Sequence, residues 1–147
     1  AGINRLDGGG GSDALAGDAG ADTLNGGAGK DLITGGADID LMSGGAGKDR
    51  YVFNSIGDSP RGAPDRITDL TDQDRILLTN IDAKVDKDGN QAFDLVSAFT
   101  AEARQAILRY DAVTDQTRLL LGVGGDGKFD GIILFHGDDR DFINFAL

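Results

Sequence analysis

The sequence predicts an all-β protein in which a parallel β-roll is capped by a C-terminal, mostly antiparallel β domain. Two observations favour this fold. Five nonapeptides follow one another without insertion over residues 8–52, so one short structural unit is stacked on its neighbours. The rest of the chain has short apolar segments separated by turn residues, which is typical of strands. We therefore expect two units, residues 1–52 and residues 53–147.

The five repeats are close to the pattern Gly-Gly-x-Gly-x-Asp-x-apolar-x. They read GGGGSDALA, GDAGADTLN, GGAGKDLIT, GGADIDLMS and GGAGKDRYV. The glycine-rich start of a unit must turn, and its last three residues can form a short strand. Two units then make one coil, so the turns that stack on each other belong to alternate repeats. The large apolar position would form a buried spine, and it is filled by Leu15, Leu24, Ile33, Met42 and Tyr51.

The acidic residues indicate a hard cation. Glu102 is the only glutamate among the 25 Asp and Glu residues, and Asp is the acidic side chain that ligates such cations from loops. Calcium takes about six to eight oxygens from carboxylates and backbone carbonyls together, which two facing turns could offer. We therefore expect several Ca²⁺ ions. They would lie between the turns of Asp13 and Asp31, of Asp22 and Asp40, and of Asp31 and Asp49.

The candidate calcium ligands are the glycines of the turns, the Asp of the sixth position, and the residues that replace them. Asp18 and Asp38 stand where the pattern has Gly, and Asp tolerates a positive φ better than most residues. The candidates within the repeats are Gly8, Gly9, Gly11, Asp13, Gly17, Asp18, Gly20, Asp22, Gly26, Gly27, Gly29, Asp31, Gly35, Gly36, Asp38, Asp40, Gly44, Gly45, Gly47 and Asp49.

Residues 1–7 fit the last seven positions of a further repeat, with Asn4 where Asp should be. Asn4 can still ligate a cation, but with a neutral oxygen. We expect that the chain begins inside a repeat array, as the C-terminal part of a longer protein or as a processed short form.

An array so rich in Gly and clustered negative charge should not fold without metal, since its only buried side chains are those of the spine. Folding and calcium binding would then be one event. The alternative is a flexible Gly- and Asp-rich linker. An apolar residue at every ninth position disfavours a linker, which has no need of one.

Two parts of the sequence resemble known families. The nonapeptide resembles the calcium-binding repeat of repeats-in-toxin proteins. Residues 51–70, YVFNSIGDSPRGAPDRITDL, resemble the close of the C-terminal domain of serralysins, which are secreted bacterial zinc metalloproteases. Residues 91–93, 106–111 and 125–130 are similar to further parts of that domain, so the resemblance covers nearly the whole chain.

The resemblance implies a right-handed, calcium-loaded parallel β-roll in a secreted, extracellular protein. It also implies that Asp58 and Asp65 supply further carboxylates to the last turns, since they lie nine and sixteen residues beyond Asp49. The alternative for Asp58 is a capping role in its own turn.

The C-terminal unit would cover the open end of the roll. Residues 100–104 could form a helical turn capped by Thr100. The Asp-rich segments 86–89 and 124–127 lack ligands that an EF-hand loop needs, so we interpret them as hairpin turns. Strands are expected at 66–70, 75–79, 92–96, 106–110, 117–122 and 131–135.

The last seven residues, DFINFAL (141–147), resemble the uncleaved secretion signal of proteins exported by the type I pathway. They could also form a terminal strand that completes the sheet, and both interpretations can hold together. Low cytosolic calcium would then keep the array unfolded for export, and external calcium would fold it.

No catalytic constellation is present, so we expect no enzymatic activity in this chain. His136 is the only histidine, which excludes a His-Glu-x-x-His zinc site, and there is no Cys nucleophile. The net charge of −11 and the pI of about 4.3 argue against nucleic acid and anionic membranes as partners. No apolar run reaches membrane-spanning length, and a monomer is expected.

Three functions remain open. The chain could be the calcium-binding module of a type I-secreted bacterial protein, with the exporter as its partner. It could instead end a surface-layer or adhesin protein, or be the non-catalytic end of a secreted serralysin-like metalloprotease. Calcium-dependent assembly into sheets or oligomers would favour the structural protein over the module.

Overall fold

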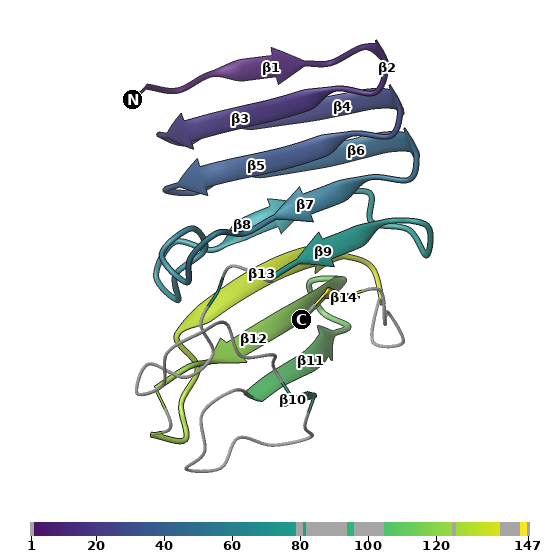
Figure 1. Cartoon of the computed structure of the whole chain (residues 1–147). Helices are drawn as coiled ribbons and strands as arrows, with labels where there is room; N and C mark the ends of the chain where they lie inside the picture. Colours follow the sequence, from purple (N-terminus) through teal and green to yellow (C-terminus); the bar gives the residue numbers. More distant parts are fainter. Residues whose placement is uncertain are drawn as a thin grey trace.

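The computed structural model describes residues 2–78, 81, 94–95, 105–124, 126–138 and 145–146. All regular secondary structure within these residues is β-strand. Figure 1 shows the N-terminal strands stacked as successive coils, with the C-terminal strands continuing below them. The predicted all-β fold, a parallel roll followed by an antiparallel part, is confirmed.

The larger sheet has nine strands. They are β1 (Arg5–Asp7), β2 (Gly10–Gly11), β4 (Thr23–Gly29), β6 (Leu41–Gly47), β8 (Asp65–Ile67), β10 (Asp94–Leu95), β11 (Gln105–Asp111), β12 (Gln116–Gly122) and β13 (Gly131–His136). Their order is β1-β4-β6-β8-β13-β12-β11-β10, and β2 also pairs with β4.

The smaller sheet has five strands. They are β3 (Ala14–Ala19), β5 (Leu32–Ala37), β7 (Arg50–Val52), β9 (Arg75–Leu77) and β14 (Phe145–Ala146). Their order is β14-β9-β7-β5-β3, so consecutive repeats alternate between the two sheets.

Strands within each sheet of the roll pair in parallel with a step of two repeats. Leu24 lies beside Met42, and Leu15 beside Ile33, so equivalent positions stack directly. This register confirms that two nonapeptides make one coil. It also buries the predicted spine, whose members Leu24, Ile33, Met42 and Tyr51 are at most 1% exposed.

The coil continues beyond Val52. Residues 53–59 are an interruption, after which Met42 pairs with Ile67 and Tyr51 pairs with Ile76. The side chains of Ile67 and Ile76 are fully buried and extend the spine. Residues 60–68 and 69–77 therefore act as two further, glycine-poor units of the roll.

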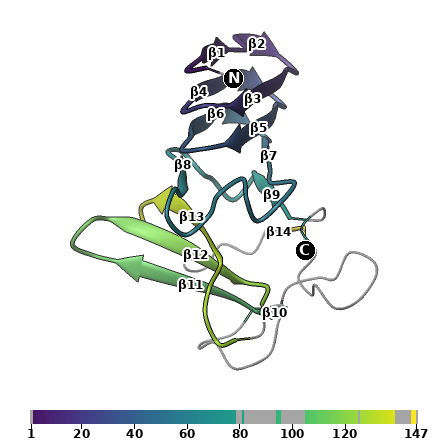
Figure 2. The same ribbon diagram turned by 90° about the vertical axis from the view of Figure 1, so that its left-hand side faces the viewer.

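The C-terminal part joins the larger sheet of the roll through β13, and β14 joins the edge of the smaller sheet. β11, β12 and β13 are antiparallel neighbours, and β13 then pairs in parallel with β8, where Phe135 lies beside Ile67. Phe135, Leu119 and Ile133 belong to the same buried cluster as the spine. The turned view in Figure 2 shows β11 and β12 projecting to one side below the coils.

The predicted strands are found where the structure describes the chain, with ends shifted by a few residues. The first ends at Ile67, because Asp69 turns back toward the last coil. The segment around residue 124 lies between antiparallel β12 and β13, as a hairpin connection requires. Residues 79, 86–89, 100–104, 125 and 141–144 lie outside the described part of the chain.

The terminal-strand interpretation is confirmed for Phe145 and Ala146, which pair in parallel with Ile76 and Leu77 at the edge of the smaller sheet. Among the described residues, no helix has the length and apolarity that crossing a membrane requires.

Candidate metal centre

Two ladders of stacked side chains run along the roll, one on each side. In every rung a backbone N–H donates to the Oδ1 of an Asp in the next coil, over 2.6 to 2.9 Å. The first ladder contains Asp13, Asp31, Asp49 and Asp74. The second ladder contains Asn4, Asp22, Asp40 and Asp65.

These hydrogen bonds use only one oxygen of each carboxylate. The second oxygen, Oδ2, is buried and accepts no hydrogen bond in Asp13, Asp22, Asp31, Asp40, Asp49 and Asp65. A buried carboxylate oxygen without a partner is costly, so each position favours a proton or a cation beside it. The Asp of each of the five repeats thus has one buried oxygen without a hydrogen-bond partner.

Backbone carbonyls converge on these oxygens. A Cβ placed on Gly26 would lie 2.6 Å from Oδ2 of Asp31 and 2.7 Å from the carbonyl oxygen of Gly44. In each of the four remaining repeats, a Cβ placed on the first glycine would likewise contact the Oδ2 of the Asp of that repeat. The absence of a side chain there leaves a small space lined by carboxylate and carbonyl oxygens, the ligand set that calcium prefers.

The two replacements of glycine keep the backbone that the turn requires. Asp18 has φ of 71° and Asp38 has φ of 82°, both in the left-handed region. Glycines at equivalent positions also have positive φ, for example Gly27 and Gly29. The expectation that Asp would preserve the turn geometry is therefore confirmed.

Burial and mutual repulsion disfavour negative charge on three ladder residues, Asp40, Asp49 and Asp65. Burial raises the pKa of Asp40 to about 6, and the nearby carboxylate of Asp22 adds to this effect. Burial raises the pKa of Asp65 to about 8, with a further contribution from the charge of Asp40. The pKa of Asp49 is raised for the same reason. A bound divalent cation would remove this penalty, so the electrostatics fit a cation site.

Among the described residues, no three Asp, Glu or His side chains gather into one metal cluster. A cation in the roll would therefore take many of its oxygens from the backbone, as the turn glycines permit. This arrangement differs from sites built from side chains alone, such as zinc centres.

The structure places the two later candidates differently. Asp65 is the last rung of the second ladder and is fully buried. Asp58 accepts hydrogen bonds from the backbone N–H groups of Asn54 and Ser55 and from the Ser55 hydroxyl, so it caps its own turn. Its charge also contributes to the raised pKa of Asp40 and Asp65, so it lies near the end of that ladder.

Two residues of this region escaped the sequence-based prediction. Asp74 forms the last rung of the first ladder, and its Oδ2 accepts from the N–H and hydroxyl of Thr71. Asp69 accepts from the N–H groups of Gly44 and Gly45 and from the Tyr51 hydroxyl. The signal for Asp74 was present, because Asp-Arg-Ile occurs at residues 65–67 and again nine residues later.

The comparison with protein families decides the identity of this chain. The model described as "Peptidase M10 serralysin C terminal" matches residues 4–145. The chain belongs to the serralysin C-terminal family. It is the non-catalytic C-terminal domain, as the sequence predicted, and the resemblance inferred from residues 51–70 is confirmed.

A relative of this serralysin C-terminal domain is the metalloprotease AprA of Pseudomonas entomophila. The two sequences are 43% identical over 85 residues, which is 56% of this chain and 17% of the relative. The chain thus spans less than one fifth of the length of this curated relative.

Two solved structures have the same fold. The R3 subunit of a mannuronan C5-epimerase from Azotobacter vinelandii (AlgE6R3) superposes with a TM-score of 0.72 at 27% identity, over 99% of this chain and 78% of that one. The R2 subunit (AlgE6R2) gives a TM-score of 0.68 at 20% identity, over 99% and 91%. The serralysin-type roll therefore also occurs in chains whose parent is named for a different activity.

Proposed function

We propose that this domain binds several calcium ions along its two ladders and folds as it binds them. The observation that carries the proposal is the buried, partnerless Oδ2 that recurs at every repeat Asp. Isolated turns would leave such oxygens in water, whereas the stacked coils hold them beside carbonyl oxygens in a space that a cation can fill.

The proposed ligands are the residues inferred from the repeat. Carbonyl oxygens of the turn glycines, and of Asp18 and Asp38, would join the ladder carboxylates. Ions would lie between stacked turns of the first ladder and, separately, of the second ladder. Asp65 extends the second set, whereas Asn4 would contribute a neutral oxygen at its other end.

Calcium fits this environment better than magnesium. Magnesium demands compact octahedral geometry and keeps much of its water, whereas calcium accepts more oxygens in irregular arrangements. A rigid stack of backbone carbonyls cannot contract around the smaller ion. We expect affinities in the range of extracellular modules, about 10⁻⁴–10⁻³ M.

We also propose that the parent protein is secreted, as serralysin-family proteases are, and that it is a metalloprotease whose catalytic part is outside this chain. Export by a type I system would use the C-terminal residues 141–147. The calcium-free chain would pass through the exporter in an unfolded state, and calcium outside the cell would then induce its folding. Deletion of residues 141–147 should abolish export, and unimpaired export would refute the signal assignment.

The test of calcium-driven folding is a titration followed by far-UV circular dichroism, with magnesium as the matched control. We expect a coil-like spectrum in chelator that becomes β-rich cooperatively near millimolar calcium, but not with magnesium. A fully β-rich spectrum in excess chelator would refute the coupling of folding to calcium.

A further inference from the structure

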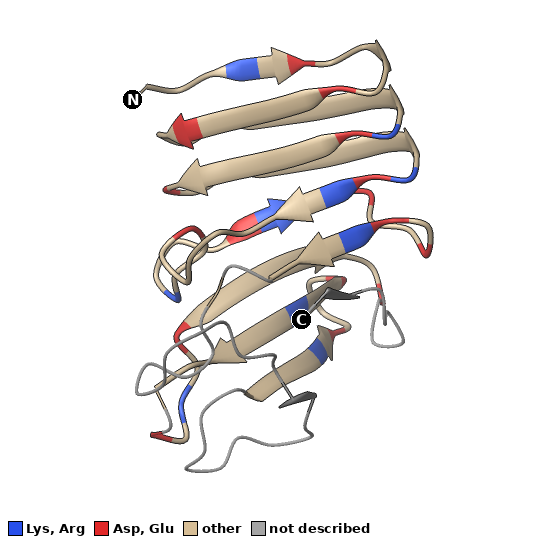
Figure 3. Ribbon diagram, in the orientation of Figure 1, with Lys and Arg blue, Asp and Glu red and all other residues tan. Residues whose placement is uncertain are grey.

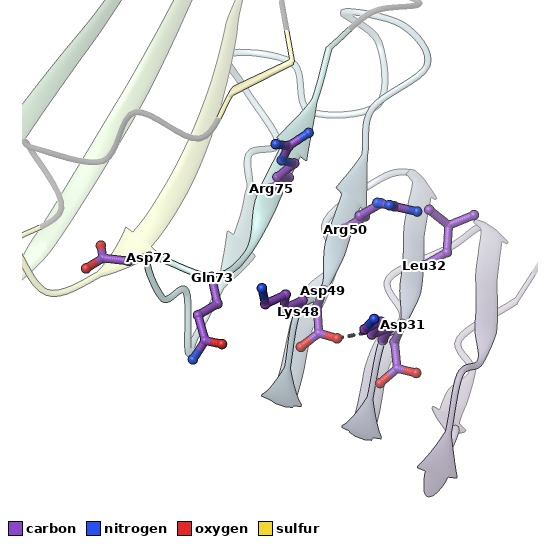
Figure 4. Close-up of a pocket in the computed structure, with 9 residues that line it drawn as sticks. Asp31, Leu32, Lys48, Asp49, Arg50, Asp72, Gln73 and Arg75 are labelled. Atoms are coloured by element: carbon purple, nitrogen blue, oxygen red, sulfur yellow. Dashed lines mark hydrogen bonds between the residues drawn. The ribbon is translucent and has the colours of Figure 1, made fainter.

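One edge of the roll carries four cationic side chains on a chain whose net charge is −11. Lys30, Lys48, Arg50 and Arg75 line one cavity of about 520 Å³ at the smaller sheet, and we name this set the cationic edge. Figure 3 shows the blue segments of β7 and β9 that belong to it, and Figure 4 shows Lys48, Arg50 and Arg75 in close-up.

The repeat spaces these charges regularly. Arg50 and Arg75 are register partners in adjacent strands, and Lys30 and Lys48 hold the same repeat position in adjacent coils. Neighbouring strands are about 4.8 Å apart, so each pair advances by that step along the roll. The cationic edge is therefore a two-row array aligned with the roll axis.

The roll itself does not require cations at these positions. On the opposite side, Ala21 and Ile39 hold the repeat position of the two lysines. Arg5, Thr23, Leu41 and Arg66 are successive register partners at the position of the arginines, so the two arginines of that side are separated by two uncharged residues. Only one of the two sides thus has the full array.

The four cations are available to a ligand. All four residues are exposed, and within the described part of the chain none of their side chains makes an ion pair or hydrogen bond. Asp31 and Asp49 also line the cavity, but both residues are buried and belong to the first ladder (Figure 4). Calcium in that ladder would neutralise them, so this inference rests on the proposed function.

We propose that the cationic edge binds a linear polysaccharide that carries a carboxylate on its sugar units, such as a polyuronate, laid along the roll axis. Lysine and arginine would pair with successive carboxylates, and arginine can do so with two parallel hydrogen bonds. Gln73 lines the same cavity and offers an amide to sugar hydroxyls.

Other polyanions fit the lining less well. Single-stranded nucleic acid is usually held by aromatic side chains that stack on bases, and the residues that line this cavity include no aromatic one. An extended peptide needs apolar pockets for its side chains, whereas Leu32 is the sole apolar residue of the lining.

The test is isothermal titration calorimetry of the calcium-loaded chain with short oligogalacturonates, which are probes of the polyuronate class. The variant Lys48→Gln/Arg50→Gln removes one of the two charges of each row. The matched control is Arg66→Gln, which removes an exposed arginine at the same repeat position on the opposite side. We expect about tenfold weaker binding by the double variant and unchanged binding by the control.

Circular dichroism in calcium separates the possible failures. A wild-type chain that folds with calcium but does not bind oligogalacturonate would overturn this inference alone, whereas absence of a calcium transition would overturn the proposed function. Equal affinities of the wild type and the double variant, or equally tight binding of single-stranded DNA through the same residues, would also overturn the inference. Neutral dextran is expected not to bind.

Discussion

The backbone N–H of Asp40 donates to Oδ1 of Asp65 over 2.8 Å, although these residues are 25 positions apart. One rung earlier, the same bond joins Asp22 to Asp40 across 18 positions. The ladder therefore follows the register of the coils and not the spacing in the sequence. The seven residues 53–59 interrupt the repeat, and the stack continues across them.

Replacing Asp65 by Asn should weaken the calcium response of the roll. The amide oxygen can still accept the Asp40 N–H, but the second carboxylate oxygen becomes an NH₂ donor that cannot ligate a cation. We expect the calcium midpoint of folding to rise about tenfold. The same titration of Asp115→Asn, in an exposed turn, should match the wild type. Equal midpoints for both variants would contradict the ladder as a calcium site.

A methyl group at Gly26 should fill the space proposed for a cation. The new Cβ would lie 2.6 Å from Oδ2 of Asp31 and 2.7 Å from the Gly44 carbonyl oxygen. We expect Gly26→Ala to lose calcium-dependent β-structure, with a cost of about 1–3 kcal/mol from overpacking alone. Gly10→Ala is the matched control, because its Cβ would meet nothing within 4 Å. Calcium titrations by circular dichroism should separate the two variants clearly.

The hydroxyl of Tyr51 donates to Oδ1 of Asp69 over 3.1 Å and ties the last strict repeat to the end of the roll. Burial next to this carboxylate raises the pKa of Tyr51, so the phenol stays protonated and remains a donor. We expect Tyr51→Phe to lower the free energy of unfolding by about 1 kcal/mol in saturating calcium. Denaturant titrations measure this change.

A double-mutant cycle with Asp69→Asn separates this hydrogen bond from lost packing. A coupling energy of about 0.5–1 kcal/mol is expected for the pair. Tyr110→Phe is the control, because the hydroxyl of Tyr110 bonds Asp115 at the surface. A coupling near zero would mean that Asp69 acts only through Gly44 and Gly45.

The sequence was sufficient to predict the spine and most of the ladders. In the strict array, the eighth position of each repeat, such as Leu24, points into the roll, and the sixth position, such as Asp22, lies in a turn. The nine-residue period alone therefore predicts both roles. The predicted strands of the C-terminal part were equally accessible from their apolar runs. The predicted boundary at residue 52 and the individual calcium ligands stay predictions.

The relationships that escaped prediction depend on tertiary structure. Asp74 continues the first ladder only because residues 53–59 interrupt the repeat and shift the count by seven. Asp69 stands where the strict repeat has Gly, at the start of the unit 69–77, and its carboxylate accepts from the N–H groups of Gly44 and Gly45. The parallel pairing of β13 with β8 joins distant segments, and no local pattern indicates it.

The pH dependence of folding without calcium should run opposite to that of an ordinary acidic protein. The raised pKa values of Asp40, about 6, and of Asp65, about 8, mean that the folded state binds protons more tightly than the unfolded state. Protonation therefore favours folding. This contribution is complete below the unfolded pKa of about 3.8 and is lost as the pH rises through about 6 and then about 8.

In chelator, β-structure measured by circular dichroism should consequently increase as the pH is lowered from about 8 to about 5. Calcium should compete with these protons, so the calcium midpoint should fall as the pH rises over the same range. Asp65→Asn removes the group with the higher pKa and should flatten both profiles above about pH 6. A chelated wild type whose β-structure instead grows with pH would show that the ladder carboxylates are charged and stabilised without metal.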